Sequence, residues 1–182
     1  MTASANANLY ARLFDGLKEP LKTAIETNGR LVSYRELEEF TARTANYLVA
    51  QGVKPGDRIA VQVEKSLAAV VLYLATIRAG AAFLPLNTAY TLNELEYFFG
   101  DAEPSLIVCD PSRAEDIRKV AQKVHAKVDT LDADGHGSLM DGAANSSPEF
   151  ETIARTGSDL AAILYTSGTT GRSKGAMLSH DN

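Results

Sequence analysis

The sequence is poor in residues that bind metals or form cross-links. Its 182 residues include one cysteine, three histidines, three methionines and no tryptophan. The single cysteine, Cys109, permits neither an intrachain disulfide nor a thiolate zinc site. His125 and His136 have no second ligand at metal-binding spacing. Because Cys109 ends the apolar run Leu106–Cys109, we expect it to be a small buried hydrophobic residue.

Clusters of basic residues and long apolar runs are also missing. The chain has 18 Lys and Arg against 23 Asp and Glu, a formal net charge of −5, which argues against nucleic acid or an anionic membrane as the main partner. Residues 1–8 lack the basic and apolar regions of a secretory signal. The best candidate for a membrane span, residues 67–86, carries Arg78, Gly80 and Pro85. We therefore expect a cytoplasmic protein without a nucleic-acid or membrane partner.

The first fifty residues predict a helix, a hairpin and a second helix. Apolar residues recur at helical spacing from Tyr10 to Leu17, and Asn28-Gly29 between two short apolar runs is typical of a tight hairpin. Ser33 and Glu36 have the spacing of a capping box at the start of the next helix. One stripe of that helix is expected to contain Leu37, Phe40, Thr44 and Leu48, ending at Gly52.

From residue 59 the chain alternates between predicted strands and helices. Apolar runs begin near Ile59, Ala81, Ser105 and Val128, at nearly even spacing. The segments between them are long enough for crossover helices and carry cap signals, namely Ser66, Gly80, Thr91 with Glu94, and Pro111. Such repetition builds a parallel sheet with helices on both faces. The sequence therefore predicts the α/β class, with a mostly parallel sheet layered with helices.

Two segments complete the predicted organisation. Residues 132–148 are rich in Asp, Gly, Ser and Ala, and we expect a surface excursion with a short helix at 139–144. Residues 160–165 form a continuous apolar run, which predicts a strand buried on both faces. Glu64, Asn87 and Asp110 follow predicted strands and carry no assigned role, because polar residues at strand ends are also ordinary turn residues.

A loop rich in glycine and hydroxyl groups follows the last of these strands. Residues 167–175 contain three glycines, four hydroxyl side chains and two cations, and Thr166 adds a hydroxyl before them. Glycines let backbone N–H groups wrap an anion, hydroxyls donate hydrogen bonds, and cations neutralise charge, so the loop suits a polyphosphate. Arg172 rather than lysine follows Gly171, so this is no Walker A motif. From the residues alone, a polar hairpin between two strands remains equally open.

A family resemblance favours the phosphate-binding interpretation. Residues 165–175 closely resemble the phosphate-binding signature of the adenylate-forming superfamily, which includes acyl-CoA synthetases, adenylation domains of peptide synthetases, and luciferases. Residues 53–60 and 84–91 resemble further phrases of this superfamily, and 84–95 is most similar to malonyl-CoA synthetases. The resemblance implies that residues 1–182 are the N-terminal portion of the large ATP-binding domain. The rest of that domain and the small C-terminal domain with its catalytic lysine would then be absent, so we expect this chain alone to be inactive.

The resemblance also implies a reaction and a set of site residues. A carboxylate, here a small one such as malonate, would attack ATP to give an acyl-adenylate and pyrophosphate, and the thiol of CoA would then displace AMP. Mg²⁺ would share the neutralisation of the phosphate charge. Thr170 is expected nearest the metal, Lys174 is expected to be a point charge on the phosphates, and Arg172 is expected to face solvent. The positions matching the family's contacts to the β- and γ-phosphates are Thr166, Ser167, Gly168, Thr169, Thr170, Gly171 and Lys174.

Three other functions remain in competition with a malonyl-CoA synthetase. The first is an adenylating enzyme for another carboxylic acid or for a carrier-protein thiol, and the second is a non-catalytic nucleotide-binding module. The third, a phosphotransferase that makes ADP, is disfavoured because the Walker lysine is missing. Ser179, His180 and Asp181 are the residue types of a hydrolase triad, but direct neighbours in sequence do not converge in that geometry.

Overall fold

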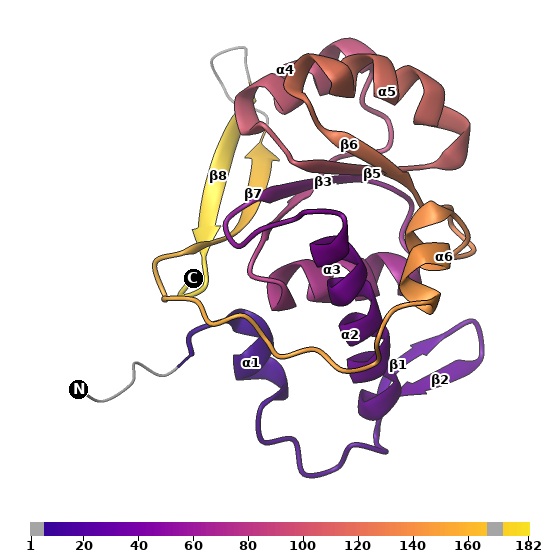
Figure 1. The fold of residues 1–182 in the computed structure, drawn as a ribbon, viewed down its shortest axis with the longest axis vertical. Helices are drawn as coiled ribbons and strands as arrows, with labels where there is room; N and C mark the ends of the chain where they lie inside the picture. Colours follow the sequence, from indigo (N-terminus) through magenta and orange to yellow (C-terminus); the bar gives the residue numbers. More distant parts are fainter. Residues whose placement is uncertain (1–5, 167–172) are drawn as a thin grey trace.

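The computed structural model describes residues 6–166 and 173–182 and shows an α/β fold. In Figure 1 the main sheet forms a layer, with α4 and α5 on one side and α2 and α3 on the other. The helices and 3₁₀ turns are α1 (Leu9–Phe14), α2 (Tyr34–Ala50), α3 (Leu67–Arg78), α4 (Leu92–Ala102), η1 (Pro111–Arg113), α5 (Ala114–Ala121), η2 (Gln122–Val124) and α6 (Ser138–Ala144). The strands are β1 (Thr23–Thr27), β2 (Arg30–Ser33), β3 (Arg58–Gln62), β4 (Ala82–Pro85), β5 (Leu106–Cys109), β6 (Lys127–Thr130), β7 (Leu160–Thr166) and β8 (Lys174–Ser179).

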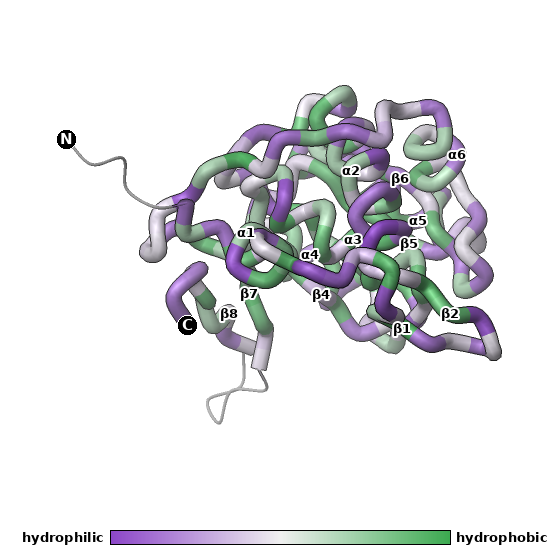
Figure 2. The backbone as a smooth tube through the Cα atoms, turned by 90° about the horizontal axis from the view of Figure 1, so that it is seen from below, coloured by the Kyte–Doolittle hydropathy of each residue, from purple (hydrophilic) through white to green (hydrophobic). Residues whose placement is uncertain are grey.

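The main sheet is mostly parallel, as the sequence predicts. In the described residues its six strands have the order β6-β5-β3-β4-β7-β8, and every neighbouring pair is parallel except β7 with β8. β1 and β2 form a separate antiparallel hairpin. The β7–β8 hairpin joins the sheet through one register pair, Phe83 with Ala162. Figure 2 shows this hairpin from below, at the margin of the molecule beside α1.

Local sequence signals placed the elements correctly. Asn28 and Gly29 have φ angles of 49° and 75°, the left-handed pair that a tight hairpin turn requires. Both predicted capping boxes are present, Ser33 with Glu36 at the start of α2 and Thr91 with Glu94 at the start of α4. The first helix is shorter than its apolar spacing suggested, because it ends at Phe14 and leaves Leu17 exposed.

The alternation of side chains along β3 separates two hydrophobic cores. Ile59 and Val61 point to one face, where they pack with buried residues of α2 and α3, and Ala60 points to the other face, toward α4 and α5. β5 behaves in the same way and is buried along its whole length, Cys109 included. Central parallel strands covered on both faces read as continuous apolar runs, which is why β3 and β5 were recognisable in the sequence.

Two expectations about burial were wrong. β7 is not buried on both faces, because Leu164 is 39% exposed and the alternate residues Leu160 and Ala162 are only partly covered. Helices cover one face of β7, and the described residues leave the other open. The segment 132–148 is more than a surface excursion, since α6 packs on α2 with Leu139 and Ala143 buried in the core.

No helix in the described ranges combines the length and hydrophobicity needed to cross a bilayer. α3 is the most apolar of the long helices, but it spans only Leu67–Arg78 and carries a buried arginine at its end. The interpretation of residues 67–86 as a helix followed by a strand is therefore confirmed.

Buried Arg78 links four segments that are distant in sequence. Its guanidinium donates to the backbone oxygens of Glu38 and Phe150 and to the hydroxyl of Thr41, and it lies 4.7 Å from the ring centre of Tyr10. The side chain is 7% exposed, so these acceptors replace water at the two terminal nitrogens of the guanidinium, whereas its Nε has no partner among the described residues. Arg78 thereby holds α1, α2, α3 and the 150 segment together.

We expect Arg78→Met to lower the free energy of unfolding by about 2–3 kcal/mol, because buried carbonyl acceptors left without a donor cost about 1–3 kcal/mol each. Urea unfolding followed by circular dichroism measures the change. Arg35→Met is the matched control, since Arg35 is exposed and should change stability by no more than about 0.5 kcal/mol. Equal losses in the two variants would contradict the role given to Arg78.

Candidate functional site

The predicted phosphate-binding loop lies between β7 and β8, at the carboxyl end of the parallel strands. β7 ends at Thr166 and β8 begins at Lys174, and these two residues face each other across the hairpin. Ligands of open α/β sheets bind beyond the carboxyl ends of the strands. The other predicted site residues, Ser167, Gly168, Thr169, Thr170 and Gly171, lie outside the described residues, as does Arg172.

The structure brings together the two site residues that it describes. Directly opposite residues of an antiparallel pair point to the same face, so the hydroxyl of Thr166 and the ammonium of Lys174 lie on one side of the hairpin. Both residues are exposed. Tyr165 and Gly175, the preceding pair, point to the opposite side, where Tyr165 packs on Phe98 of α4 with ring centres 4.5 Å apart. The face with Thr166 and Lys174 therefore offers a hydroxyl and a cation to an anionic ligand.

Tyr165, the first residue of the predicted phosphate-binding signature, has a shifted pKa. Its pKa is raised, first by burial and then by the hydrogen bond that its hydroxyl donates to the carboxylate of Asp101. The phenol is therefore neutral across the physiological range and acts as a hydrogen-bond donor. Its contact lies on α4, away from the face that carries Thr166 and Lys174.

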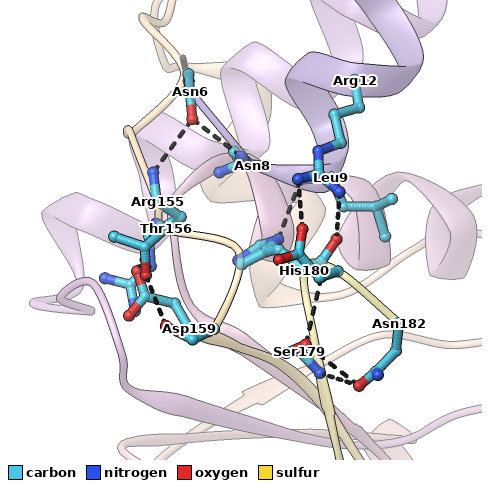
Figure 3. A network of polar contacts seen from close by, with 12 residues as sticks. Asn6, Asn8, Leu9, Arg12, Arg155, Thr156, Asp159, Ser179, His180 and Asn182 are labelled. Carbon is cyan, nitrogen blue, oxygen red and sulfur yellow. Dashed lines mark hydrogen bonds and ion pairs between the residues drawn. The ribbon is translucent and has the colours of Figure 1, made fainter. Parts of the chain in front are cut away.

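The opposite end of the hairpin is fastened to the N-terminal helix (Figure 3). Nδ1 of His180 accepts a hydrogen bond from the backbone N–H of Leu9 at 3.0 Å. Arg12 donates to the backbone oxygen of His180 at 2.9 Å and pairs with Asp181 at 2.6 Å. The sequence argues against a catalytic triad of Ser179, His180 and Asp181. The structure agrees, because His180 is 1% exposed and its Nδ1 is hydrogen-bonded to a backbone N–H.

The environment of His180 keeps the imidazole neutral. Its pKa is lowered by burial first and then by the positive charge of Arg155, against the weaker opposing effect of Asp159. Nε2 is buried without a hydrogen-bond partner among the described residues. Accepting the Leu9 N–H at Nδ1 requires a neutral ring with its proton on Nε2.

A polar network lies at the carboxyl ends of the central strands β3 and β5. The guanidinium of Arg113 donates to Oε1 of Gln62 at 2.7 Å and to the backbone oxygens of Thr88 and Tyr90 at 3.0 Å each. Nε2 of Gln62 donates to the backbone oxygen of Asn87 at 2.8 Å. These contacts hold the 87–90 segment over the carboxyl ends of β3 and β5, the position where ligands of open sheets usually bind.

The three polar residues without an assigned role behave as turn residues. Oδ1 of Asn87 accepts from the backbone N–H of Ala89, and Oδ1 of Asp110 accepts from that of Ser112. Glu64 is exposed after β3. Sequence reasoning missed Gln62 and Arg113, and the only signal was a polar residue at the end of an otherwise apolar strand.

Other parts of the described chain do not offer a competing catalytic centre. A cavity of about 540 Å³ lies between the β1–β2 hairpin and the start of α3, and its lining includes neither Thr166 nor Lys174. Burial raises the pKa of Cys109 to about 11, so its thiol is not a nucleophile at neutral pH. No group of three or more His, Cys, Asp or Glu side chains in residues 6–166 and 173–182 could hold a metal ion.

Comparison with known proteins assigns the family. The model of the family described as AMP-binding enzyme matches residues 16–182. The chain belongs to the AMP-binding enzyme family. The apo structure of MatB from Rhodopseudomonas palustris aligns with 97% of this chain and 35% of that chain, with 63% sequence identity and a TM-score of 0.95. An ATP-bound structure of MatB matches with a TM-score of 0.94 at the same identity.

Two relatives with lower sequence identity are named as different enzymes. Tyrocidine synthase 2 from Brevibacillus parabrevis is 36% identical over 93% of this chain and 4% of its own length. Feruloyl-CoA synthase from an Amycolatopsis species is 35% identical over 90% of this chain and 31% of its own length. The chain therefore spans about a third or less of the length of these relatives.

The neutral state of His180 predicts a pH dependence of stability. The pKa in the folded chain lies below the unfolded value of about 6.5, so the unfolded chain takes up the proton more readily. The stabilisation is complete above pH 6.5 and is lost as the pH falls from there toward the lowered folded pKa. Urea unfolding between pH 7.5 and 5 measures this slope.

His180→Asn is the control for this measurement, because its side-chain oxygen can still accept the Leu9 N–H but does not titrate. We expect its stability to fall less steeply than that of the wild type between pH 7 and 5. Identical slopes in the two proteins would rule out His180 as the titrating group.

Proposed function

We propose that residues 1–182 form the N-terminal portion of the large ATP-binding domain of an AMP-forming acyl-CoA synthetase, an acid–thiol ligase. The signature at residues 165–175, carried on a hairpin at the carboxyl edge of a parallel sheet, is the observation on which this proposal rests. The 63% identity to MatB, which has been solved with ATP, supports it. The match to MatB covers 35% of that chain, so the activity of the whole enzyme is part of the proposal.

The proposed reaction has two steps. In the first, a carboxylate oxygen of the acid attacks the α-phosphorus of ATP, and the bond to the bridging oxygen breaks to release pyrophosphate. In the second, the deprotonated thiol of CoA attacks the acyl carbon of the adenylate, and AMP leaves with its phosphate oxygen. ATP and CoA are thus substrates, with a small carboxylate as the third.

Residues of the hairpin would stabilise the charge that develops on pyrophosphate. Positioned donors act most strongly where charge appears in the transition state. The exposed Thr166 and Lys174 lie on one face, as a shared phosphate ligand requires. The sequence signature alone supports the assignment of the remaining phosphate contacts, which are Ser167, Gly168, Thr169, Thr170 and Gly171.

The described donor set fits the phosphates of a nucleotide better than a free metal ion. It offers a hydroxyl and an ammonium group, and the described chain has no cluster of acidic or imidazole ligands. Mg²⁺ would therefore be held by phosphate oxygens, with the Thr170 hydroxyl as its nearest ligand from this chain. When bound, the ion supplies Lewis-acid neutralisation of phosphate charge.

Malonate is the acid we propose. The segment 84–95 is most similar to malonyl-CoA synthetases, and the identity to MatB, 63%, far exceeds the 35% identity to feruloyl-CoA synthase. An adenylating enzyme that transfers another acid, or that uses a carrier-protein thiol, is the second candidate. It is supported by the 36% identity to tyrocidine synthase 2.

A product analysis of the full-length protein separates these functions. The enzyme is supplied with ATP, Mg²⁺, CoA and one of malonate, methylmalonate, acetate or a long fatty acid, and AMP, ADP and pyrophosphate are quantified. We expect AMP and pyrophosphate, formed fastest with malonate. If AMP and pyrophosphate form fastest with another acid, the protein is still an AMP-forming acyl-CoA synthetase but malonate is rejected. Formation of ADP, or no acid-dependent cleavage of ATP, would reject this enzyme class.

Substitutions in the loop test the proposed roles of its residues. We expect Thr170→Ala and Lys174→Ala each to slow adenylation by an amount equivalent to one positioned donor, about 2.7–4 kcal/mol, without lowering the melting temperature. Acid-dependent exchange of labelled pyrophosphate into ATP measures this step. Arg172→Ala, which removes a neighbouring charge, is the control and should retain wild-type turnover. Near wild-type exchange in the Thr170 and Lys174 variants would refute their assignment.

A further inference from the structure

Both ends of the predicted phosphate loop are attached to one helix. Before the loop, the hydroxyl of Tyr165 donates to the carboxylate of Asp101. After the loop, the backbone oxygen of Ser173 accepts from the hydroxyl of Tyr97 at 3.0 Å. Tyr97 and Asp101 are four residues apart on α4, so they lie on the same face of the helix.

α4 is a rigid support for these two contacts. Its N-terminus is fixed by the capping box of Thr91 and Glu94, and its inner face is buried through Leu95, Phe98 and Phe99 in the core with β4 and β5. The ring of Phe98 packs against Tyr165, with ring centres 4.5 Å apart. The helix therefore offers one fixed surface to both strands of the hairpin.

The middle of the hairpin is anchored by Ile163 of β7, which is buried in the core cluster with Leu84 and Phe98. Residues 174–177 of β8 are exposed, and β7 joins β4 through one register pair at Phe83 and Ala162. The contacts of His180 with α1 lie at the far end of β8. Among the described residues beside the loop ends, Tyr97, Phe98 and Asp101 of α4 contact Ser173 and Tyr165, and they relate this end of the hairpin to the sheet.

We propose that Tyr97 and Asp101 are positioning residues that fix the loop-bearing end of the hairpin relative to α4 and the sheet. Tyr165 directly precedes Thr166, and Ser173 directly precedes Lys174, so each contact fixes the residue beside a proposed phosphate donor. The inference rests on the proposed function, because the loop matters to ATP only if it binds phosphate. Loss of either contact lets this end of the hairpin shift against α4 as a paired unit and weakens ATP binding.

The closing experiment compares three tyrosine variants of the full-length protein. Tyr97→Phe removes the hydroxyl that donates to Ser173, Tyr165→Phe removes the hydroxyl that donates to Asp101, and both keep the ring. Tyr47→Phe is the matched control, because the Tyr47 hydroxyl donates to the carboxylate of Asp129 on β6, far from the loop. Asp101→Asn is a conservative variant that keeps an acceptor for Tyr165.

Two readouts are measured for each variant. We expect KM for ATP to rise about fivefold in Tyr97→Phe and Tyr165→Phe, the factor for one net hydrogen bond, with KM for CoA unchanged. Amide hydrogen exchange of peptides covering 174–179 should accelerate by a similar factor, and this readout needs no catalysis. Tyr47→Phe should alter neither quantity, and Asp101→Asn should fall between wild type and Tyr165→Phe.

The outcomes separate this proposal from the proposed function. Unchanged exchange of the 174–179 peptides in Tyr97→Phe and Tyr165→Phe would overturn the positioning role, whether or not the enzyme consumes ATP. Faster exchange with an unchanged KM for ATP in an active enzyme would also overturn it, because the contacts would then be structural only. A wild-type protein with no acid-dependent use of ATP would refute the proposed function, and hydrogen exchange alone would then decide whether α4 holds the hairpin.

Discussion

The attachment of the β7–β8 hairpin to the sheet is the constraint on which the site depends. One register pair, Phe83 with Ala162, joins β7 to β4, while β8 is an edge strand with its residues 174–177 exposed. Because β7 and β8 pair with each other through six register positions, contacts outside this ladder act on the position of the hairpin as a whole. The structure supplies them at the two ends of β8, through α4 near the loop and through α1 at the far end.

The two attachments differ in their chemistry and so in their sensitivity to conditions. At α4 they are phenol hydroxyls that donate to a carboxylate and to a backbone oxygen, and burial keeps Tyr165 protonated. At α1 the acceptor is the neutral imidazole of His180, which acid converts into a cation close to Arg12 and Arg155. Protonation of His180 removes the acceptor at the far end of the hairpin, whereas the contacts beside the loop involve no histidine.

What the sequence predicted was local, and what it missed depends on contacts between distant segments. The capping boxes, the Asn28-Gly29 turn and the central strands each follow from a few adjacent residues. The exposure of β7 depends on whether a helix covers its second face, and its apolar run cannot report that. The contact between Gln62 and Arg113 at the ends of β3 and β5 depends in turn on strand order, which joins residues 51 positions apart.

The contrast between features set by adjacent residues and features set by distant contacts also applies to the site. The sequence predicted the chemistry of the loop because its glycines and hydroxyl side chains are contiguous. Tyr97 and Asp101 resemble ordinary helix-surface residues in the sequence, and only the fold brings them into contact with the residues at the loop ends. Arg113 and Gln62 fix the 87–90 segment, and that segment leads into the capping box that starts α4. The polar network at the ends of β3 and β5 is thereby connected, through one capped helix, to the loop ends. A functional loop needs such support from rigid elements, since donors are effective only when they are held in place.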